Sequence, residues 1–443
     1  MAETVGIVAS RDLIARGALR VGDAVGASFA RALASQARLQ AFAWLPSVLD
    51  VAAVDPRLPL AGIAVAVKDL IDTADMPTTY GSPIYAGHRP AADAWIVKRL
   101  RALGAHVLGK SVTTEFAWRH PGPTVNPWEP RHTPGGSSSG SAASVAAGIV
   151  GLAIGTQTLG SVIRPASFCG VVGFKPSYGA IPRTGVRALS SSLDHIGIFT
   201  RDVADAMYAI ELLVARSAAD PHGQPFAALE SAASVPVRTA PPVIGVLDQP
   251  QLGAMDGEQA SLMQDVAHQL HERGATMCKL HLPSAFENAA ELTALLAAAE
   301  AAQHHEMHRT QFRHLLSPAM AALLDQGAAM SASEIEALRA SQRALQQGYA
   351  NWWRSAGIDA LLVPPAPGEA PYGLDYTGDA RFCSPFTLAG VPAITVPAGF
   401  GAHGLPLGMQ LVGAAGQDRS LLHVAYWCEQ ALERQTAIAP GWF

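Results

Sequence analysis

The sequence predicts an α/β fold, with one large domain over residues 1–443 in which strands and helices alternate and pack in layers. Two observations support this prediction. Hydrophobic residues make up 49% of the chain and charged residues 15%, which provides material for a large core and argues against disorder. Short apolar runs alternate with longer segments whose apolar residues recur every three or four positions, the patterns of strands and helices respectively.

Helices are predicted where the longer spacing appears or where capping residues bracket a segment. In the segment 93–103, apolar residues recur at i, i+1, i+4 and i+7, and Gly104 follows as a stop signal. Ser10 and Gly17 are cap candidates at the two ends of a short helix, and Pro165 suits the first turn of another. The predicted helices are 10–17, 25–39, 93–103, 258–273, 285–314, 333–353 and 418–433.

Strands are predicted where short apolar or alternating runs occur. The segment 63–68 ends at Lys68, and position alone favours a solvated lysine at a strand end. Residues 217–242 are rich in Pro, Ala and Ser and predict a long loop, not a domain boundary, because strand and helix patterns resume beyond it. The predicted strands are 63–68, 105–108, 150–154, 171–174, 243–247, 276–280, 360–363, 393–396 and 409–412.

Charge and cysteine usage narrow the class of protein. The net charge is −5 at pH 7 with no run of Lys and Arg, so we expect no nucleic-acid partner. The sequence contains no uninterrupted apolar run of about 20 residues, so we expect no membrane span. The first residues lack the basic region that is typical of a signal peptide. The cysteines are far apart with no C-x-x-C, which favours reduced thiols and a cytoplasmic protein. They are Cys169, Cys278, Cys383 and Cys428.

The stretch 132–166 carries the strongest chemical signal. Two serine- and glycine-rich loops, 135–141 and 156–161, bracket a run of small apolar residues. Glycine lets a loop aim its N–H groups inward, and a serine becomes a nucleophile when a base takes its proton. A flexible linker is the alternative interpretation of GGSSSG, but it fits poorly because a segment that looks packed and a second polar loop follow.

These loops resemble the amidase signature family of serine hydrolases. The matching pieces are PGGSSSGSAASVAAG, GTQTLGSVIRPASFCGVVGFKPS and the upstream GIAVAVKDLIDT, with GVPAITVPAGF and LPLGMQLVG near the C-terminus. The resemblance implies one mixed sheet with helices on both faces. It also implies a triad in which Ser161 is the nucleophile, Ser137 is a bridging serine after a cis peptide bond, and Lys68 is the general base.

The same resemblance implies acyl transfer through a covalent ester on a small-molecule amide, followed by hydrolysis. No metal or organic cofactor is expected. The backbone N–H groups that would form the oxyanion hole are those of Thr158, Leu159, Gly160 and Ser161. The resemblance does not decide the oligomeric state, and a homodimer is one possibility.

One detail of register resembles the malonamidase branch of the family. Arg164 lies three places after the proposed nucleophile instead of two, and Gln157 stands where many members have Asp. This register suggests that Arg164 grips a substrate carboxylate, with Gly136 also in the substrate site. A structural role for Arg164, tying its loop to the fold, stays open. Leu159 stands where Gly is commoner in the family, so we expect a narrower pocket beside the nucleophile.

Three other functions remain as alternatives to a stand-alone amidase. The chain could be the glutaminase subunit of a tRNA-dependent amidotransferase, which would work only inside an obligate complex. It could be a carbamate- or anilide-cleaving hydrolase with the same triad and a broader pocket. A non-catalytic binding protein is the third alternative, and the joint presence of Lys68, Ser137 and Ser161 argues against it.

A phosphate-binding motif matches without its structural context. Gly104, Gly109, Lys110 and Ser111 fit G-x-x-x-x-G-K-S. That motif needs a strand before the first glycine and a helix from the lysine, whereas here a helix precedes it and the middle residues are the strand. We therefore predict no nucleotide site.

Two further patterns suggest chemistry that the context does not favour. Ser138 lies in a G-x-S-x-G match, but prolines interrupt the segment where a nucleophile elbow needs a strand. Asp194 and His195 are adjacent in sequence and give no support for a Ser–His–Asp triad.

Three histidines share one face of the helix predicted at 285–314, and without a Cys or carboxylate pattern we predict a solvated face, not a metal site. They are His304, His305 and His308.

Overall fold

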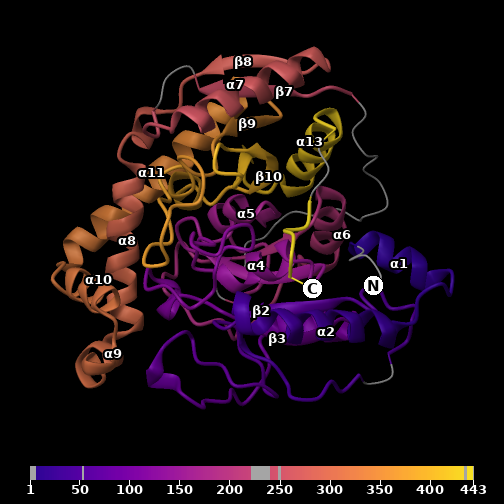
Figure 1. The fold of residues 1–443 in the computed structure, drawn as a ribbon. Helices are drawn as coiled ribbons and strands as arrows, with labels where there is room; N and C mark the ends of the chain where they lie inside the picture. Colours follow the sequence, from indigo (N-terminus) through magenta and orange to yellow (C-terminus); the bar gives the residue numbers. More distant parts are fainter. Residues whose placement is uncertain (1–5, 52–53, 221–239, 248–250, 434–436, 443) are drawn as a thin grey trace.

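The computed structural model describes residues 6–51, 54–220, 240–247, 251–433 and 437–442. Within them, eleven strands form one mixed sheet flanked by helices (Figure 1), which confirms the predicted α/β fold. The strand order is β1-β3-β2-β4-β6-β5-β10-β11-β9-β7-β8. Their bounds are β1 Phe42–Trp44, β2 Ala64–Lys68, β3 His106–Ser111, β4 Leu152–Gln157, β5 Val172–Lys175, β6 His195–Thr200, β7 Val243–Leu247, β8 Thr276–Leu280, β9 Ala360–Val363, β10 Ala393–Phe400 and β11 Pro406–Val412.

Parallel pairing is confined to two groups of three strands, and the edge strand β1 lies antiparallel to β3. β2 lies parallel to both β3 and β4, and β7 lies parallel to both β8 and β9. The strands between these groups, from β4 through β6, β5, β10 and β11 to β9, pair antiparallel. All nine predicted strands are present, whereas β1 and β6 were not predicted. β6 contains a histidine and a glycine, and its pairing with β4 and β5 outweighs its weak local pattern.

The helices occupy both faces of this sheet. Their bounds are α1 Ile7–Ala15, α2 Val21–Leu39, α3 Trp95–Ala102, α4 Ser139–Ala146, α5 Ile163–Cys169, α6 Val203–Leu213, α7 Gly257–Glu272, α8 Ala289–His304, α9 Glu306–Gln311, α10 Pro318–Ala328, α11 Ala332–Ala356, α12 Ser384–Leu388 and α13 Asp418–Ala431. In Figure 1, α8, α9 and α10 gather at one side of the molecule, where α8, α10, α11 and α12 share a core with the far end of the sheet.

Side-chain alternation along β2 decides which face the proposed base occupies. Val65 and Val67 pack into a core with α3, α6 and α13, whereas Ala64 and Ala66 pack with α2 and α4. Because successive residues of a strand point to opposite faces, Lys68 emerges on the side of α4.

The first helix begins earlier than its predicted cap. α1 starts at Ile7, so Ser10 lies inside the helix and was wrongly predicted as its N-cap. The carboxylate of Asp205 accepts hydrogen bonds from the N–H groups of Ile7 and Val8, at 2.8 and 2.9 Å. A distant side chain therefore supplies the acceptor that a local cap would provide.

The predicted helix 285–314 is broken, and two of its histidines are buried. α8 ends at His304 and α9 follows after His305. The Nδ1 atoms of His305 and His308 are 3.0 Å apart, and Nε2 of His308 lies 2.9 Å from the Tyr85 hydroxyl. The predicted solvated face was wrong for His305 and His308, because the break and this aromatic packing enclose both rings; His304 is exposed.

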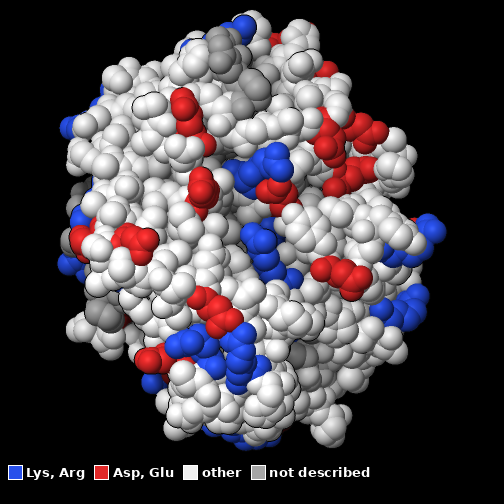
Figure 2. Space-filling view, turned by 90° about the vertical axis from the view of Figure 1, so that its left-hand side faces the viewer, with Lys and Arg blue, Asp and Glu red and all other residues white. Residues whose placement is uncertain are grey.

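The predicted loop 217–242 lies mostly outside the described residues. Among the helices that the structure describes, none combines the length and the apolar character needed to cross a bilayer. On the face in Figure 2, acidic and basic side chains are interspersed, and several Lys or Arg side chains lie in a hollow near its centre.

The crossing of α8 and α10 gives a test of the packing. A Cβ at Gly327 would overlap the carbonyl oxygen of Ala298, which belongs to the backbone of α8. We expect Gly327→Ala to lower the free energy of unfolding by about 3 kcal/mol, the upper end for overpacking. Gly348→Ala is the matched control, because no atom lies within 4 Å of its new Cβ, and it should stabilise α11 by about 0.5–1 kcal/mol. Chemical denaturation measures both; equal stabilities would contradict this crossing.

Candidate active site

Lys68 is completely buried at the end of β2, so it is not a solvated edge residue. Its Nζ lies 2.7 Å from the Ser137 hydroxyl, 2.8 Å from the Thr156 hydroxyl and 3.4 Å from the Thr156 carbonyl oxygen. Burial holds the pKa of Lys68 well below its usual range, because desolvation disfavours the ammonium form, and the charge of Asp194 opposes this only in part. A neutral amine placed here can accept a proton from Ser137.

Ser137 reaches the lysine from the loop before α4. The peptide bond between Gly136 and Ser137 is cis, as predicted. Gly135 has φ +79°, and a Cβ there would lie 2.8 Å from Cα of Pro165. Glycine is therefore required at position 135 both for the backbone conformation and for the close approach to α5.

Ser161 lies in the turn between β4 and α5 and keeps 5% of its surface exposed. The backbone N–H groups of residues 158–161 donate to no protein acceptor in the part of the chain that the structure describes. Such donors are available to an oxyanion. No hydrogen bond joins the hydroxyls of Ser137 and Ser161 among the described residues; contacts of this kind commonly tighten only when substrate binds.

Gln157, the last residue of β4, fixes this turn. Its Oε1 accepts hydrogen bonds from the N–H groups of Val162 and Ile163, at 2.8 and 3.0 Å. Its Nε2 donates to the Thr387 hydroxyl at 2.9 Å, and that hydroxyl donates to the Leu159 carbonyl at 2.8 Å. A carboxylate could accept the first two bonds but could not donate the third. The amide therefore connects both ends of the turn to α12.

Arg164 is buried in the first turn of α5. Its Nη2 donates to the Gly136 carbonyl at 2.6 Å and to the Thr377 hydroxyl at 3.3 Å, while its Nε is buried with no hydrogen-bond partner. The nearby Asp379 bonds to Arg381 instead. The guanidinium is thus anchored to the carbonyl of the cis peptide bond, and no described carboxylate bonds to it.

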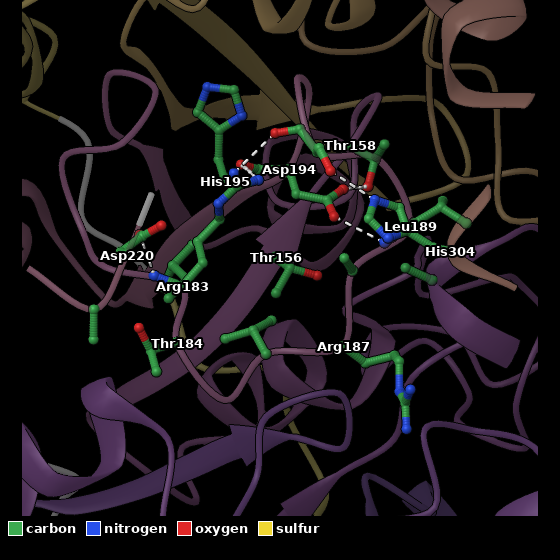
Figure 3. Close-up of a pocket in the computed structure, with 16 residues that line it drawn as sticks. Thr156, Thr158, Arg183, Thr184, Arg187, Leu189, Asp194, His195, Asp220 and His304 are labelled. Carbon is green, nitrogen blue, oxygen red and sulfur yellow. Dashed lines mark hydrogen bonds between the residues drawn. The ribbon is translucent and has the colours of Figure 1, made fainter. Parts of the chain in front are cut away.

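A cavity of about 180 Å³ opens beside the end of β4 (Figure 3). Thr156, Thr158 and Asp194 line it. Oδ1 of Asp194 accepts a hydrogen bond from the Thr158 hydroxyl at 2.6 Å, and Oδ2 accepts from the N–H groups of Leu189 and Ser190 at 2.8 and 3.0 Å. Three neutral donors therefore hold this carboxylate.

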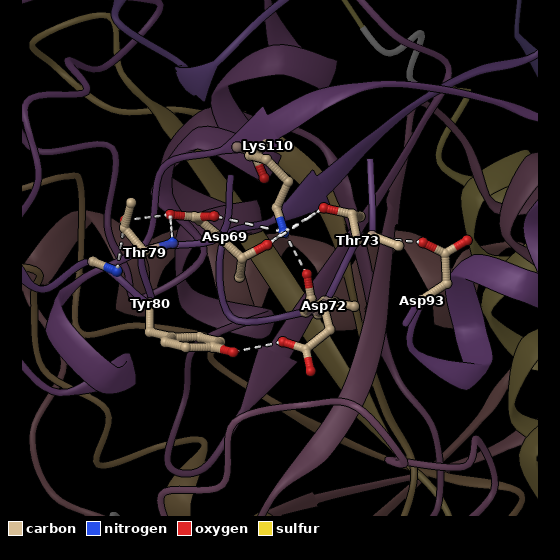
Figure 4. A network of polar contacts seen from close by, with 12 residues as sticks. Asp69, Asp72, Thr73, Thr79, Tyr80, Asp93 and Lys110 are labelled. Atoms are coloured by element: carbon tan, nitrogen blue, oxygen red, sulfur yellow. Dashed lines mark hydrogen bonds and ion pairs between the residues drawn. The ribbon is translucent and has the colours of Figure 1, made fainter. Parts of the chain in front are cut away.

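Lys110, from the phosphate-binding pattern, lies inside β3 and not at the start of a helix. Its Nζ donates to the Thr78 hydroxyl at 2.8 Å and to the Ile71 carbonyl, and lies 3.6 Å from Oδ1 of Asp69 (Figure 4). Asp69 also accepts two hydrogen bonds from Thr79. Burial lowers the pKa of Lys110 to about 8, with Asp69 opposing. The network ties the segment after β2 to β3.

The G-x-S-x-G match at Ser138 does not form a nucleophile elbow. Ser138 is buried, and its hydroxyl donates to the Thr156 carbonyl at 3.2 Å and accepts from the Thr156 N–H at 3.3 Å. Nδ1 of His195 lies 2.6 Å from the Leu193 carbonyl. Both side chains are engaged with the backbone. In the described residues, no group of three or more His, Cys, Asp or Glu side chains is arranged to hold a metal ion.

Sequence reasoning missed three residues of the site. Thr156 contacts Lys68, Asp194 holds Thr158, and Thr387 holds the turn through Leu159. The position of Thr156 in the strand that leads into the turn of Ser161 could have indicated it. Asp194 and Thr387 come from distant segments, and nothing in their local sequence indicates this contact.

Comparison with known proteins adds a family match over most of the chain. Residues 23–422 match the family model described as Amidase. A glutamyl-tRNA(Gln) amidotransferase subunit of Synechococcus sp. (strain WH7803) is 36% identical over 436 residues, covering 86% of this chain and 87% of that protein. The structure of the corresponding subunit from Thermotoga maritima superposes with a TM-score of 0.83 at 26% identity, covering 99% of both chains. A peptide amidase from Stenotrophomonas maltophilia gives 0.80 at 28% identity, covering 98% of both chains.

The buried thiols give a test that a cysteine is not the nucleophile. None of the four cysteines forms a disulfide, and Cys278 is the most exposed. Burial raises the pKa of Cys383 to about 12 and that of Cys169 beyond the usual range. We expect a chromogenic disulfide reagent to titrate about one thiol per folded chain, and to titrate all four after denaturation. Cys278→Ser should abolish the fast reaction. Fast labelling of Cys169 or Cys383 would contradict this placement.

Proposed function

Since the chain belongs to the amidase family, we propose that this amidohydrolase cleaves a small-molecule carboxamide through an acyl-enzyme on Ser161, releasing ammonia or an amine. The observation that carries the proposal is the buried Lys68, whose Nζ lies 2.7 Å from the Ser137 hydroxyl and whose pKa is held well below its usual range by burial. The unpaired N–H groups of residues 158–161 support it, because they provide donors for a developing oxyanion.

The chemistry follows from a relay of two protons. Neutral Lys68 takes the proton of Ser137 while Ser137 takes that of Ser161, and the Ser161 oxygen attacks the amide carbonyl. The negative charge on the carbonyl oxygen is met by the N–H groups of residues 158–161. The same relay returns a proton to the leaving nitrogen, and water then repeats the sequence on the ester.

A carboxylate on the acyl part is the substrate feature that we propose for recognition. Arg164 places a buried positive charge next to the cis peptide bond, and its bonded acceptors, Gly136 and Thr377, are neutral. Binding a carboxylate there would compensate the charge through a charge-assisted contact. Malonamate and glutamine both meet this description, since each is a primary amide that also bears a carboxylate.

Between these two substrates, the relatives favour glutamine. The similarity to the glutamyl-tRNA(Gln) amidotransferase subunit of Synechococcus extends over 86% of the chain, which supports the glutaminase alternative more than a malonamidase. Gln157, one of the two residues that suggested the malonamidase branch, is explained by its contacts within the turn. We therefore propose glutamine hydrolysis for partner subunits as the first candidate and a stand-alone amidase on a malonamate-like substrate as the second.

The nucleophile is tested by covalent labelling. We expect a fluorophosphonate probe to label Ser161, as mapped by mass spectrometry, and Ser161→Ala to abolish both labelling and turnover. Ser137→Ala should leave a small residual activity, because it removes the proton bridge but keeps the nucleophile. Ser144→Ala is the control, since that hydroxyl bonds only within α4, and it should label normally. Labelling of Ser138 or Cys169 would overturn the triad assignment.

Substrate preference is tested by ammonia release from glutamine, malonamate, a neutral aliphatic amide and an anilide. We expect the carboxylate-bearing amides to react best. If glutamine is hydrolysed only when a co-purified partner protein is present, this chain is one subunit of a complex. Arg164→Gln should lower kcat/KM on every substrate because it releases Gly136. On carboxylate-bearing amides the variant also loses a contact worth about 1.5–3 kcal/mol, so kcat/KM should fall by a further factor of roughly 10 to 150. Equal losses on charged and neutral amides would make Arg164 a structural residue.

A further inference from the structure

The proposed relay makes Lys68 positive for a moment during each proton transfer. Its Nζ has three oxygen acceptors, from Ser137 and Thr156, which suits the three N–H bonds of an ammonium. All three acceptors are uncharged, however, and no carboxylate bonds to Lys68 among the described residues. A buried ammonium without a countercharge is costly, so the charge must be balanced from further away.

We propose that Asp194 is a positioning residue that supplies this countercharge, and that Thr158 ties it to the turn that carries Ser161. The proposal rests on the proposed function, because it concerns the protonated form of the general base. It assigns a role to an aspartate that the Ser–His–Asp pattern had suggested for a different mechanism.

The geometry connects the two charges through β4. Thr156 lies in β4 and Thr158 is the residue just after the end of this strand. The first hydroxyl is 2.8 Å from Nζ of Lys68, and the second is 2.6 Å from Oδ1 of Asp194. Both threonines and Asp194 line the same cavity (Figure 3). The lysine and the carboxylate are therefore bonded to two threonines that lie two positions apart, one in β4 and one in the turn that follows it.

The charge of Asp194 is not cancelled by a bonded cation. Its two oxygens accept hydrogen bonds from a hydroxyl and two backbone N–H groups. Arg183, the nearby cation, donates to the backbone carbonyl of Asp194 at 2.8 Å and to the Ser191 carbonyl and the Tyr178 hydroxyl. Burial raises the pKa of Asp194, whereas the charge of Arg183 and the three donated hydrogen bonds lower it and so stabilise the carboxylate form. The negative charge of that carboxylate raises the pKa of Lys68 against the effect of burial.

The other ionisable groups around Lys68 and Asp194 are paired or neutral. On β3, Lys110 lies 3.6 Å from Asp69, the neighbour of Lys68, so these two charges offset each other. On β6, burial holds the pKa of His195 well below its usual range, which keeps its ring neutral. On α8, Glu300 pairs with Arg339 and accepts from Ser190 and Ser192; α4 carries no ionisable side chain. Asp194 is the carboxylate in this set without a paired cation.

The experiment measures the rate of fluorophosphonate labelling of Ser161 against pH, which needs no knowledge of the substrate. In this step the Ser161 oxygen attacks phosphorus, fluoride leaves, and the serine proton passes through Ser137 to Lys68. The rate should rise with pH as Lys68 loses its proton. Asp194→Asn removes a negative charge that favours the ammonium form, so the midpoint of the rise should move down by about one pH unit. The plateau should fall by up to about tenfold, because the base is weaker.

Two further variants separate charge from tethering. Thr158→Val breaks the hydrogen bond to Asp194 but keeps the carboxylate, so labelling should slow at every pH while the midpoint stays. Arg183→Gln removes the cation beside Asp194, so the midpoint should move up, opposite to Asp194→Asn. A folded Asp194→Asn protein with the wild-type midpoint would overturn the proposal. If that variant does not fold, an unmoved or lowered midpoint in Arg183→Gln would overturn it.

The same assay distinguishes this inference from the proposed function. A probe that fails to label Ser161 in the wild-type chain would reject the acyl-enzyme itself. If Ser161 is labelled normally and the midpoint of the pH profile is the same in the Asp194 and Arg183 variants as in the wild type, the acyl-enzyme stands and only the countercharge is rejected.

Discussion

The burial of one amine at the end of β2 governs the arrangement of this site. The alternation of β2 directs Lys68 toward α4, where the preceding loop brings Ser137 within 2.7 Å. β4 lies beside β2 and supplies Thr156, so the acceptors of the amine come from two elements that the sheet holds in register. The cis peptide bond, the positive φ of Gly135 and the close packing of that loop on α5 all serve to place a hydroxyl against a desolvated nitrogen.

Three buried lysines in the same sheet differ in the groups that surround the amine. Lys110 on β3 has a carboxylate at 3.6 Å, and its pKa is lowered to about 8. Lys175 on β5 donates to backbone carbonyls, with Asp418 acting on it through charge, and its pKa is lowered to about 7. Lys68 has hydroxyl partners and the more distant Asp194, and its pKa is held well below the usual range. In all three lysines burial lowers the pKa, and a carboxylate opposes that effect.

The sequence predicted the strands well, because burial imposes local patterns on them. It could not predict the state of Lys68, since the pattern of 63–68 fits a solvated end equally well, and only the family resemblance pointed to a base. The N-terminal acceptor of α1, supplied by Asp205, and the burial of His305 depend on segments far away in the chain. The same holds for Asp194, whose contacts are specified by the fold and not by its neighbours in sequence.

Gln157 suggested the malonamidase branch, but its contacts concern the turn and its charge balance. Thr156 and Thr158 line the cavity, and the side chain of Gln157 between them bonds to α5 and to Thr387. An aspartate there would place a second buried negative charge between the two threonines that link Lys68 to Asp194. The neutral amide keeps the hydrogen bonds of the turn without adding that charge. On the proposal made above, the countercharge for a protonated Lys68 is then left to Asp194, and Gln157 by itself says little about which amide is bound.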